Sequence, residues 1–271
     1  MSHRQGNAML ISSSAHIARG SVIEPGAVIG AQVCIGPFCV ITAGVEIGEG
    51  TVIASHVVIN GQTRIGRNNS IGRYSSIGEV NQDLKYAGEA TDVVIGDRNH
   101  IGEKATIHRG TVQGRGRTAI GHDNRILNSV HIGHDCVIGN GTLIGNNSGL
   151  AGHVELDDAV QIGVMCAIHQ FCILGAYAQI ADRSGVVQDV PPFVCASGNH
   201  ALPTGFNQSA VAFLAADIQQ QQEIRTFYDR IYHLAMPFDE AKKEAARLAI
   251  HYPLLRLFDQ FFSRSTRGII R

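Results

Sequence analysis

Five of the thirteen histidines, between residues 108 and 169, are the residues best suited to chemistry. They are His108, His131, His134, His153 and His169. An imidazole exchanges a proton near neutral pH, so one of them could act as a general base. Several imidazoles brought together could instead bind zinc. Their spacing in the sequence is irregular, so the structure that positions them decides between these chemistries.

A six-residue repeat supplies that structure. Ile, Leu or Val returns at every sixth position within residues 11–77, 95–107 and 120–186. A period of six fits neither an α-helix nor a long strand. It fits a short strand followed by a turn, three of which close a triangular coil of about 18 residues. The sequence therefore predicts a parallel β-helix whose stacked coils bury the aliphatic residues.

The repeat also divides the chain. We expect the β-helix over residues 10–200, with two inserted loops, residues 79–94 and 113–119, where the register is interrupted. After about Gly198 the repeat ends, and apolar residues recur at helical spacing. Residues 201–271 are therefore expected to form a small C-terminal helical domain, whose first helix Asn207 or Ser209 could cap.

Counting the hexads in threes places one set of aliphatic positions on a single face of the column. The set is Ile77, Ile107, Ile132, Leu150 and Ile168. Both loops leave from this face, and the five histidines are close to these positions in the sequence. Binding and catalytic residues are often carried on loops that a rigid scaffold holds. This face is therefore predicted to carry the active site.

The pairing of His134 with Gly152 indicates acyl transfer. Gly152 follows His134 by one coil, so the two backbones should be neighbours in the ladder. An imidazole could take the proton from an attacking hydroxyl, while the glycine N–H stabilises the oxyanion on the acyl carbonyl. Asp135 could orient the imidazole. A zinc site on several histidines, as in hexapeptide-repeat carbonic anhydrases, is the alternative from another class.

Charge and composition exclude other classes of function. A net charge of −1 provides no basic field for nucleic acid or an anionic membrane surface. No apolar stretch approaches the roughly 18 residues of a membrane span, and the polar residues 1–7 lack the apolar core of a secretory signal. The six cysteines include no CxxC pair, as expected for reduced core residues of a cytoplasmic protein.

Several segments together closely resemble one enzyme family, over nearly the whole chain from about Leu10. These are residues 78–88, 106–114, 134–136, 150–153, 167–172, 188–192, 198–201 and 262–268. The family is that of the acyl-[acyl-carrier-protein]–UDP-N-acetylglucosamine O-acyltransferases of the lipid A pathway. Several of the motifs, such as the Asn-Gln-Asp-Leu-Lys-Tyr segment after Val80, are specific to that enzyme rather than to hexapeptide-repeat proteins in general.

The resemblance implies a left-handed β-helix, a homotrimer and active sites between adjacent β-helices. It also implies transfer of an (R)-3-hydroxyacyl group from acyl carrier protein to the 3-hydroxyl of UDP-N-acetylglucosamine. This is the first step of lipid A biosynthesis. No metal or organic cofactor is expected, apart from the phosphopantetheine arm that carries the donor.

The family's functional residues can be carried onto this sequence. The resemblance makes His134 the general base, Asp135 the carboxylate that orients it and Gly152 the donor of the oxyanion amide. It implies substrate contacts at Gln82, Asp83, Lys85, His108, His131, His153, Gln170 and Asn207. The position that measures acyl length corresponds to Asp182.

Two departures from the family pattern leave the substrates open. Phe213 and Leu214 stand where family members commonly carry an Arg pair that contacts the nucleotide phosphates. Asp182 stands where a small or apolar residue is expected, and an unpaired buried carboxylate would disfavour a long acyl chain. An acyltransferase acting on another nucleotide sugar or on an amino acceptor is therefore a second hypothesis.

Overall fold

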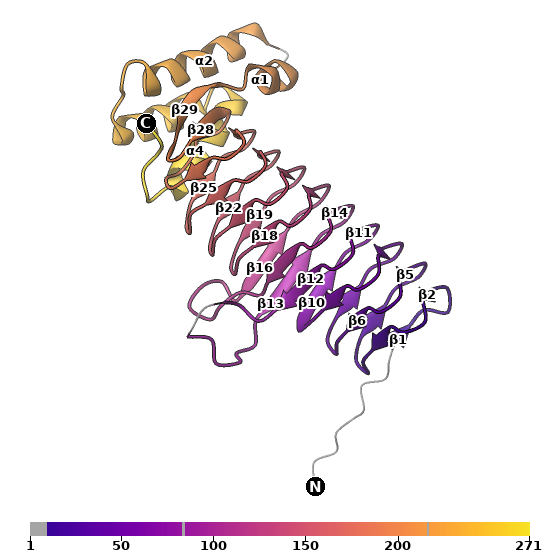
Figure 1. Cartoon of the computed structure of the whole chain (residues 1–271). Coiled ribbons are helices and arrows are strands. Elements are labelled where there is room, and N and C mark those ends of the chain that lie inside the picture. The colour runs from indigo at the N-terminus through magenta and orange to yellow at the C-terminus, as the bar shows by residue number, and fades with distance from the viewer. Residues whose placement is uncertain (1–9, 83–84, 216) are drawn as a thin grey trace.

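The computed structural model describes residues 10–82, 85–215 and 217–271 of the chain. Its main part is a three-sided column of short parallel strands, with helices at one end (Figure 1). Each coil of the column contributes one strand to each of three sheets, as the hexapeptide repeat predicted. The structure thus confirms a left-handed parallel β-helix followed by a C-terminal helical region.

The three sheets are named here A, B and C. Sheet A contains β1 (Leu10–Ile11), β4 (Val28–Ile29), β7 (Glu46–Ile47), β10 (Gln62–Ile65), β13 (Asp92–Ile95), β16 (Arg117–Ile120), β19 (Val137–Ile138), β22 (Glu155–Leu156) and β25 (Ile173–Leu174). Sheet B contains β2 (His16–Ile17), β5 (Cys34–Ile35), β8 (Val52–Ile53), β11 (Ser70–Ile71), β14 (His100–Ile101), β17 (Arg125–Ile126), β20 (Leu143–Ile144), β23 (Gln161–Ile162), β26 (Gln179–Ile180), β28 (Val194–Gly198) and β29 (Ala201–Phe206). Sheet C contains β3 (Val22–Ile23), β6 (Val40–Ile41), β9 (Val58–Ile59), β12 (Ser76–Glu79), β15 (Thr106–His108), β18 (His131–Ile132), β21 (Gly149–Leu150), β24 (Ala167–Ile168) and β27 (Gly185–Val186).

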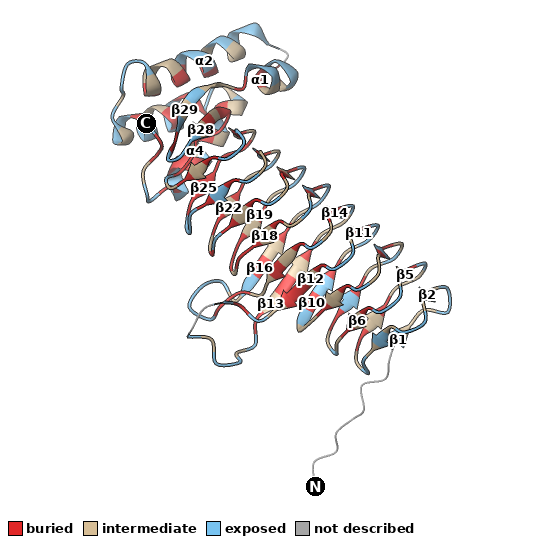
Figure 2. Ribbon diagram, in the orientation of Figure 1, coloured by how far each residue is buried: buried red, intermediate tan, exposed pale blue. Residues whose placement is uncertain are grey.

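The repeating aliphatic residues stack in the centre of the column, where Figure 2 shows the inward positions buried along its length. On sheet C the stack pairs Ile77 with Ile107, Ile107 with Ile132, Ile132 with Leu150 and Leu150 with Ile168. The predicted set of positions therefore does share one face. Burial of these side chains is the main stabilising term, worth roughly 1.5–3 kcal/mol for each.

The turns between strands follow a rule that matters for the site. The second residue after each core aliphatic has an N–H that the ladder leaves without a partner. At four consecutive coils of the corner that follows sheet A, from Arg67 to Asn140, a side chain one coil further on accepts it. Asp97 Oδ1 accepts from Arg67 N at 2.7 Å, and Asp158 Oδ1 accepts from Asn140 N at 2.7 Å. Such side-chain acceptors complete the hydrogen bonding of the turn.

Both loops leave the column after strands of sheet C. The first follows β12 and the second occupies residues 109–116 between β15 and β16. The flanking strands are longer than expected, because Asp92–Ile95 pairs with Gln62–Ile65 on one side and with Arg117–Ile120 on the other. The strands therefore include residues that the six-residue spacing had assigned to the loops at 79–94 and 113–119.

The end of the column is closed by β28 and β29, an antiparallel pair. The expected boundary between residues 200 and 201 falls inside this hairpin. The helices then follow as α1 (Gln208–Leu214), α2 (Ile218–Tyr232), α3 (Phe238–Leu248), the short 3-10 helix η1 (Pro253–Leu255) and α4 (Arg256–Arg264). Among the residues described, no helix has the length and apolar character to cross a membrane.

Candidate active site

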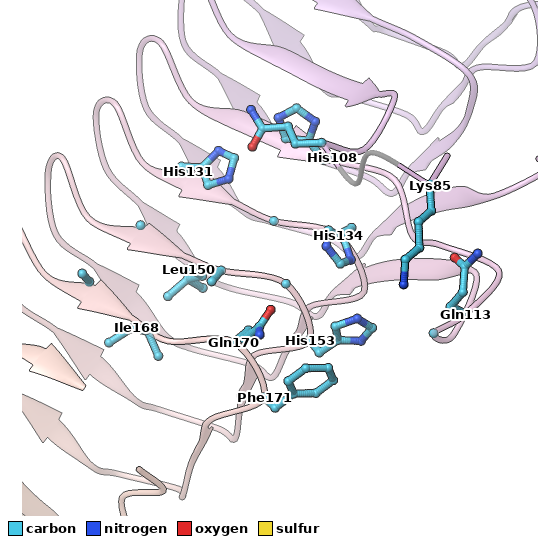
Figure 3. Close-up of a pocket in the computed structure, with 17 residues that line it drawn as sticks. Lys85, His108, Gln113, His131, His134, Leu150, His153, Ile168, Gln170 and Phe171 are labelled. Atoms are coloured by element: carbon cyan, nitrogen blue, oxygen red, sulfur yellow. The ribbon is translucent and has the colours of Figure 1, made fainter. Parts of the chain in front are cut away.

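A cavity of about 990 Å³ lies beside sheet C, at the corner where its strands end. It is lined by both loops and by four consecutive coils. Residues from the two loops and from neighbouring coils, far apart in the sequence, approach one another there, as Figure 3 shows. Eight expected site residues line it, namely Gln82, Lys85, His108, His131, His134, Gly152, His153 and Gln170. The repeat therefore brings together residues that are far apart in sequence.

His134 and Asp135 form a hydrogen-bonded pair below the cavity. His134 Nδ1 lies 2.9 Å from Asp135 Oδ2, and the Asp135 side chain is fully buried while that of His134 is 19% exposed. A carboxylate accepts hydrogen bonds only, so Nδ1 carries the ring proton. Nε2 then presents a lone pair, which is the state that a general base requires.

The second loop holds the Asp135 carboxylate. Thr111 donates its N–H and its hydroxyl to Oδ2 at 2.9 and 2.7 Å, and Arg115 N donates to Oδ1 at 2.8 Å. Burial by itself would raise the pKa of Asp135, but the hydrogen bonds from Thr111, His134 and Arg115 outweigh it and lower that pKa. The carboxylate is therefore kept ionised, although no part of it reaches solvent.

Gly152 lies directly under the His134 ring. A Cβ built on Gly152 would come within 2.5 Å of Cε1 and 2.6 Å of Nε2 of the imidazole. Only glycine leaves space for the ring in this position. Among the described residues no group accepts the Gly152 N–H. The turn rule explains this, since the residue one coil further on is Gln170, whose side chain does not reach back as Asp158 and Asp97 do.

His153 extends the site by one coil. Its ring stacks on Phe171, with centroids 4.4 Å apart and planes 8° apart, and meets the His134 ring edge-on at 4.9 Å. His153 Nε2 is 3.8 Å from Asp135 Oδ2. Figure 3 shows His134, His153 and Phe171 following one another along the corner. The stack fixes the plane of the His153 ring.

His108 and His131 line the end of the cavity nearest the first loop. Their ring centroids are 5.2 Å apart. His108 Nδ1 contacts the backbone oxygen of Val80 at 2.7 Å, and His131 Nδ1 contacts Thr106 Oγ1 at 2.9 Å. Burial lowers the pKa of His131, and charge on His108 and His134 lowers it further. His131 is therefore favoured as a neutral hydrogen-bonding group.

The lining residues that were not among the expected site residues include Phe171 and Gln113. Phe171 follows His153 by one coil, so the same arithmetic that paired His134 with Gly152 could have found it. Gln113 belongs to the second loop, beside Lys85 of the first in Figure 3. No repeat register reaches Gln113, so the sequence offered no comparable signal. His169 does not line the cavity, although Gln170 beside it does.

The remaining expected residues lie elsewhere. Asp83 is outside the described residues. Asn207 caps α1, with Oδ1 accepting from Ala210 N at 3.1 Å and Nδ2 donating to Tyr177 O at 2.9 Å. It therefore has a structural role, as the predicted N-cap, and does not line the cavity. Phe213 of α1 is 88% exposed.

Asp182 lies on the turn that enters sheet C, not in the cavity. Its Oδ1 accepts the backbone N–H of Val164, one coil back, at 2.9 Å. This hydrogen bond, at the corner that follows sheet B, has the same pattern as those described for the corner after sheet A. The carboxylate is exposed and accepts a hydrogen bond from a backbone amide of its own chain.

One group of side chains in the site could hold a metal ion. Among the described residues, ligand atoms of His134, Asp135 and His153 all lie within 4.8 Å of one another. The group consists of two imidazoles and a carboxylate, not the three imidazoles of the carbonic anhydrase hypothesis.

Comparison with known proteins identifies the family. Residues 189–270 match the family model described as UDP N-acetylglucosamine O-acyltransferase, domain 2, and residues 26–61 and 117–152 match the bacterial transferase hexapeptide model. The structure of LpxA from Acinetobacter baumannii is 38% identical, covers 97% of this chain and all of its own, and superposes with a TM-score of 0.85.

Two further structures agree. The UDP-N-acetylglucosamine acyltransferase of Francisella novicida is 36% identical, with 97% of this chain and 94% of that one covered and a TM-score of 0.81. The Arabidopsis UDP-N-acetylglucosamine acyltransferase is 30% identical, with 97% and 100% covered and a TM-score of 0.70. These similarities extend over almost the full length of the chain. The chain belongs to the LpxA family of UDP-N-acetylglucosamine O-acyltransferases.

Proposed function

We propose that this enzyme transfers an (R)-3-hydroxyacyl group from acyl carrier protein to the 3-hydroxyl of UDP-N-acetylglucosamine, with His134 as general base. This is the first step of lipid A biosynthesis and would take place in the cytoplasm. Family membership supports the acceptor and the reaction class. The observation that carries the mechanism is the position of the His134 ring, with Nδ1 on a buried carboxylate and Nε2 next to the Gly152 backbone.

The chemical step uses these groups in order. His134 Nε2 accepts the proton of the sugar hydroxyl as its oxygen attacks the thioester carbonyl. Asp135 stabilises the imidazolium that forms, and the tetrahedral intermediate places its oxyanion near the Gly152 N–H. When the carbon–sulfur bond breaks, the imidazolium returns the proton to the departing thiolate of the phosphopantetheine arm. General-base assistance of this kind contributes about 10²–10⁴ to the rate.

The unoccupied hydrogen-bonding capacity of Gly152 supports its role. At several other turns of the column, the amide at this position is satisfied by a side chain one coil further on, as for Arg67, Asn140 and Val164. Gly152 is buried, and the structure provides no such acceptor for it. A donor that needs no rearrangement before the reaction can stabilise an oxyanion by about 3–4 kcal/mol.

Substrate contacts are assigned along the cavity. Gln82, Lys85, His108 and His131 lie toward the first loop, and His153 and Gln170 lie beyond His134. The roles of Asp83 and Asn207 as substrate contacts rest on family resemblance. We further propose, from the family resemblance, that a neighbouring copy covers the cavity in a homotrimer, where the small residues Gly149 and Ala167 on its wall would allow close approach.

The two departures from the family pattern lead to proposals about acyl chain length and about the nucleotide acceptor. Family resemblance assigns Asp182 to the end of the acyl site, where covering its exposed carboxylate with a long acyl chain would be costly and chains shorter than about 14 carbons would be favoured. Phe213 and Leu214, in place of an Arg pair, weaken recognition of the nucleotide phosphates. An acceptor other than UDP-N-acetylglucosamine is the second candidate that this replacement favours.

A reconstituted assay tests the proposal. The purified chain is incubated with 3-hydroxyacyl-carrier protein and, separately, UDP-N-acetylglucosamine, its 3-amino analogue and other UDP sugars. The expected result is an ester at the 3-oxygen of UDP-N-acetylglucosamine, formed with the highest kcat/KM of the series. Exclusive acylation of another acceptor would overturn the assignment.

A further inference from the structure

The pair of histidines around Asp135 has the donor atoms of a metal site. The separation of Asp135 Oδ2 from His134 Nδ1 is 2.9 Å, and from His153 Nε2 it is 3.8 Å. Metal–ligand bonds of about 2.0–2.1 Å in a tetrahedral zinc site place neighbouring ligand atoms about 3.3 Å apart. The two measured separations lie on either side of that value, and all ligand atoms of the group lie within 4.8 Å of one another. Binding therefore requires the side chains to close on the ion and Asp135 Oδ2 to give up hydrogen bonds from Thr111.

We propose that His134, Asp135 and His153 reversibly bind a divalent transition-metal ion such as Zn²⁺, and that the bound ion inhibits the enzyme. Two imidazoles, one carboxylate and an open fourth position are a donor set common in protein zinc sites. The cavity that His134 and His153 both line adjoins the group, so a water molecule or a substrate atom could supply the fourth ligand. Phe171 stacks on His153 and holds its ring in place for the metal.

The expected inhibition follows from the proton on His134. A neutral imidazole carries a single N–H. A metal on Nδ1 displaces the hydrogen bond to Asp135 and leaves the ring proton on Nε2. Nε2 then has no lone pair for the sugar hydroxyl. Binding of the metal is independent of the proposed function, but inhibition rests on it, because it requires Nε2 of His134 to be the base.

Other His–Asp pairs in the described residues provide a comparison. His233 lies 3.1 Å from Asp229 on the surface of α2, and His122 lies 3.6 Å from Asp97. No third ligand completes either pair within the part of the chain described. His233 is therefore a matched control, a histidine beside an aspartate that should not bind the ion tightly.

Cobalt spectroscopy and zinc titration test the binding. Co²⁺ added to the full chain should give the visible absorption of a four-coordinate site, and calorimetry should give one equivalent of Zn²⁺. His153→Gln, with His153→Asn as a second variant, should weaken Zn²⁺ binding by roughly tenfold or more. His233→Gln should bind as the parent does. Absence of one tight equivalent in the parent, or unchanged binding in both His153 variants, would overturn the site.

The acyltransferase assay tests inhibition. Zn²⁺ should lower turnover in parallel with occupancy of the site, and a chelator should restore it. Full activity at saturating occupancy would overturn the inhibition, and with it the assignment of Nε2 as the base, while the binding data would stand. Activity that depends on zinc and is lost on chelation would also contradict the proposal.

Discussion

Gly152 lies one coil beyond His134, and a Cβ at this position would come within 2.6 Å of the imidazole Nε2. The imidazole therefore rests on the backbone of the next coil, beside an N–H for which the described residues provide no acceptor. Base and oxyanion donor are held together by the stacking of the column rather than by a loop. This relationship makes the site sensitive to small changes at either residue.

Gly152→Ala should inactivate the enzyme without unfolding it. The added methyl group displaces the His134 ring from its position next to the amide, and misplaced catalytic groups can cost about 10² in rate. The measurement is kcat together with the melting temperature. Gly205→Ala is the control and should keep normal kcat, because a Cβ there has open space, φ is ordinary and the residue does not line the cavity. Retention of normal kcat in Gly152→Ala would show that the ring position is not critical.

Gln170→Asn should block the Gly152 amide. At several other turns, Asn or Asp one coil further on accepts the N–H of the equivalent turn residue, as Asn140 does for His122 at 2.8 Å. An Asn at position 170 should do the same for Gly152 and lower kcat by roughly 10²–10³, the cost of losing an oxyanion donor.

Gln170→Ala is the matched control for this experiment. It removes the same substrate contact but supplies no acceptor, so its kcat should exceed that of Gln170→Asn by at least about tenfold. Equal kcat values in the two variants would mean that the Gly152 N–H does not act in the reaction.

Thr111→Val should destabilise the enzyme on acidification. The lowered pKa of Asp135 contributes stability that is present above the ordinary value of 3.8 and is lost as the pH falls through the folded-state value. Without the Thr111 hydroxyl the folded-state pKa rises, so the loss begins at a higher pH. The lost hydrogen bond to a charged group costs about 1.5–3 kcal/mol near neutral pH. Denaturant unfolding across the acidic range measures both effects.

Thr111→Ser keeps the hydroxyl and should restore most of the stability and of kcat. If the free energy of unfolding of Thr111→Val falls at the same acidic pH as that of the parent, this hydroxyl does not control the ionisation of Asp135.

Asp182→Gly should shift the donor preference toward longer acyl chains. Asp182→Asn removes the charge while keeping an acceptor for Val164 N–H, which the glycine variant loses. If charge sets the chain length, both variants should accept longer donors, and only Asp182→Gly should lose stability. Competition between acyl-carrier-protein donors of different length provides the measurement. An unchanged preference in both variants would remove Asp182 from the acyl site.

The sequence predicted the column and the face that carries the site, because one core aliphatic in every six residues defines the register. Once the register is known, a spacing of one coil places His134 above Gly152 and His153 above Phe171. The register could not predict what the loops contribute. Thr111 and Arg115 bind Asp135 from a segment that follows no repeat, so their contacts depend on a loop conformation that has no periodic signal.

The six-residue register also does not determine where the loops end or what role Asn207 has. The strand Asp92–Ile95 extends into the first expected loop because it has a four-residue partner on both sides, a pairing that core spacing does not encode. Asn207 carried two predictions, an N-cap and a nucleotide contact. The cap is confirmed by its bond to Ala210 N, and the nucleotide contact remains a prediction.

The most direct test of the account is turnover by His134→Ala with a 3-hydroxyacyl-carrier protein and UDP-N-acetylglucosamine. Loss of the base should lower kcat by about 10² or more while the protein stays folded, because the His134 side chain is not part of the hydrophobic core. The melting temperature should fall by no more than the loss of its one hydrogen bond to Asp135 requires. Near-normal kcat in a folded His134→Ala protein would contradict the assignment of His134 as the general base.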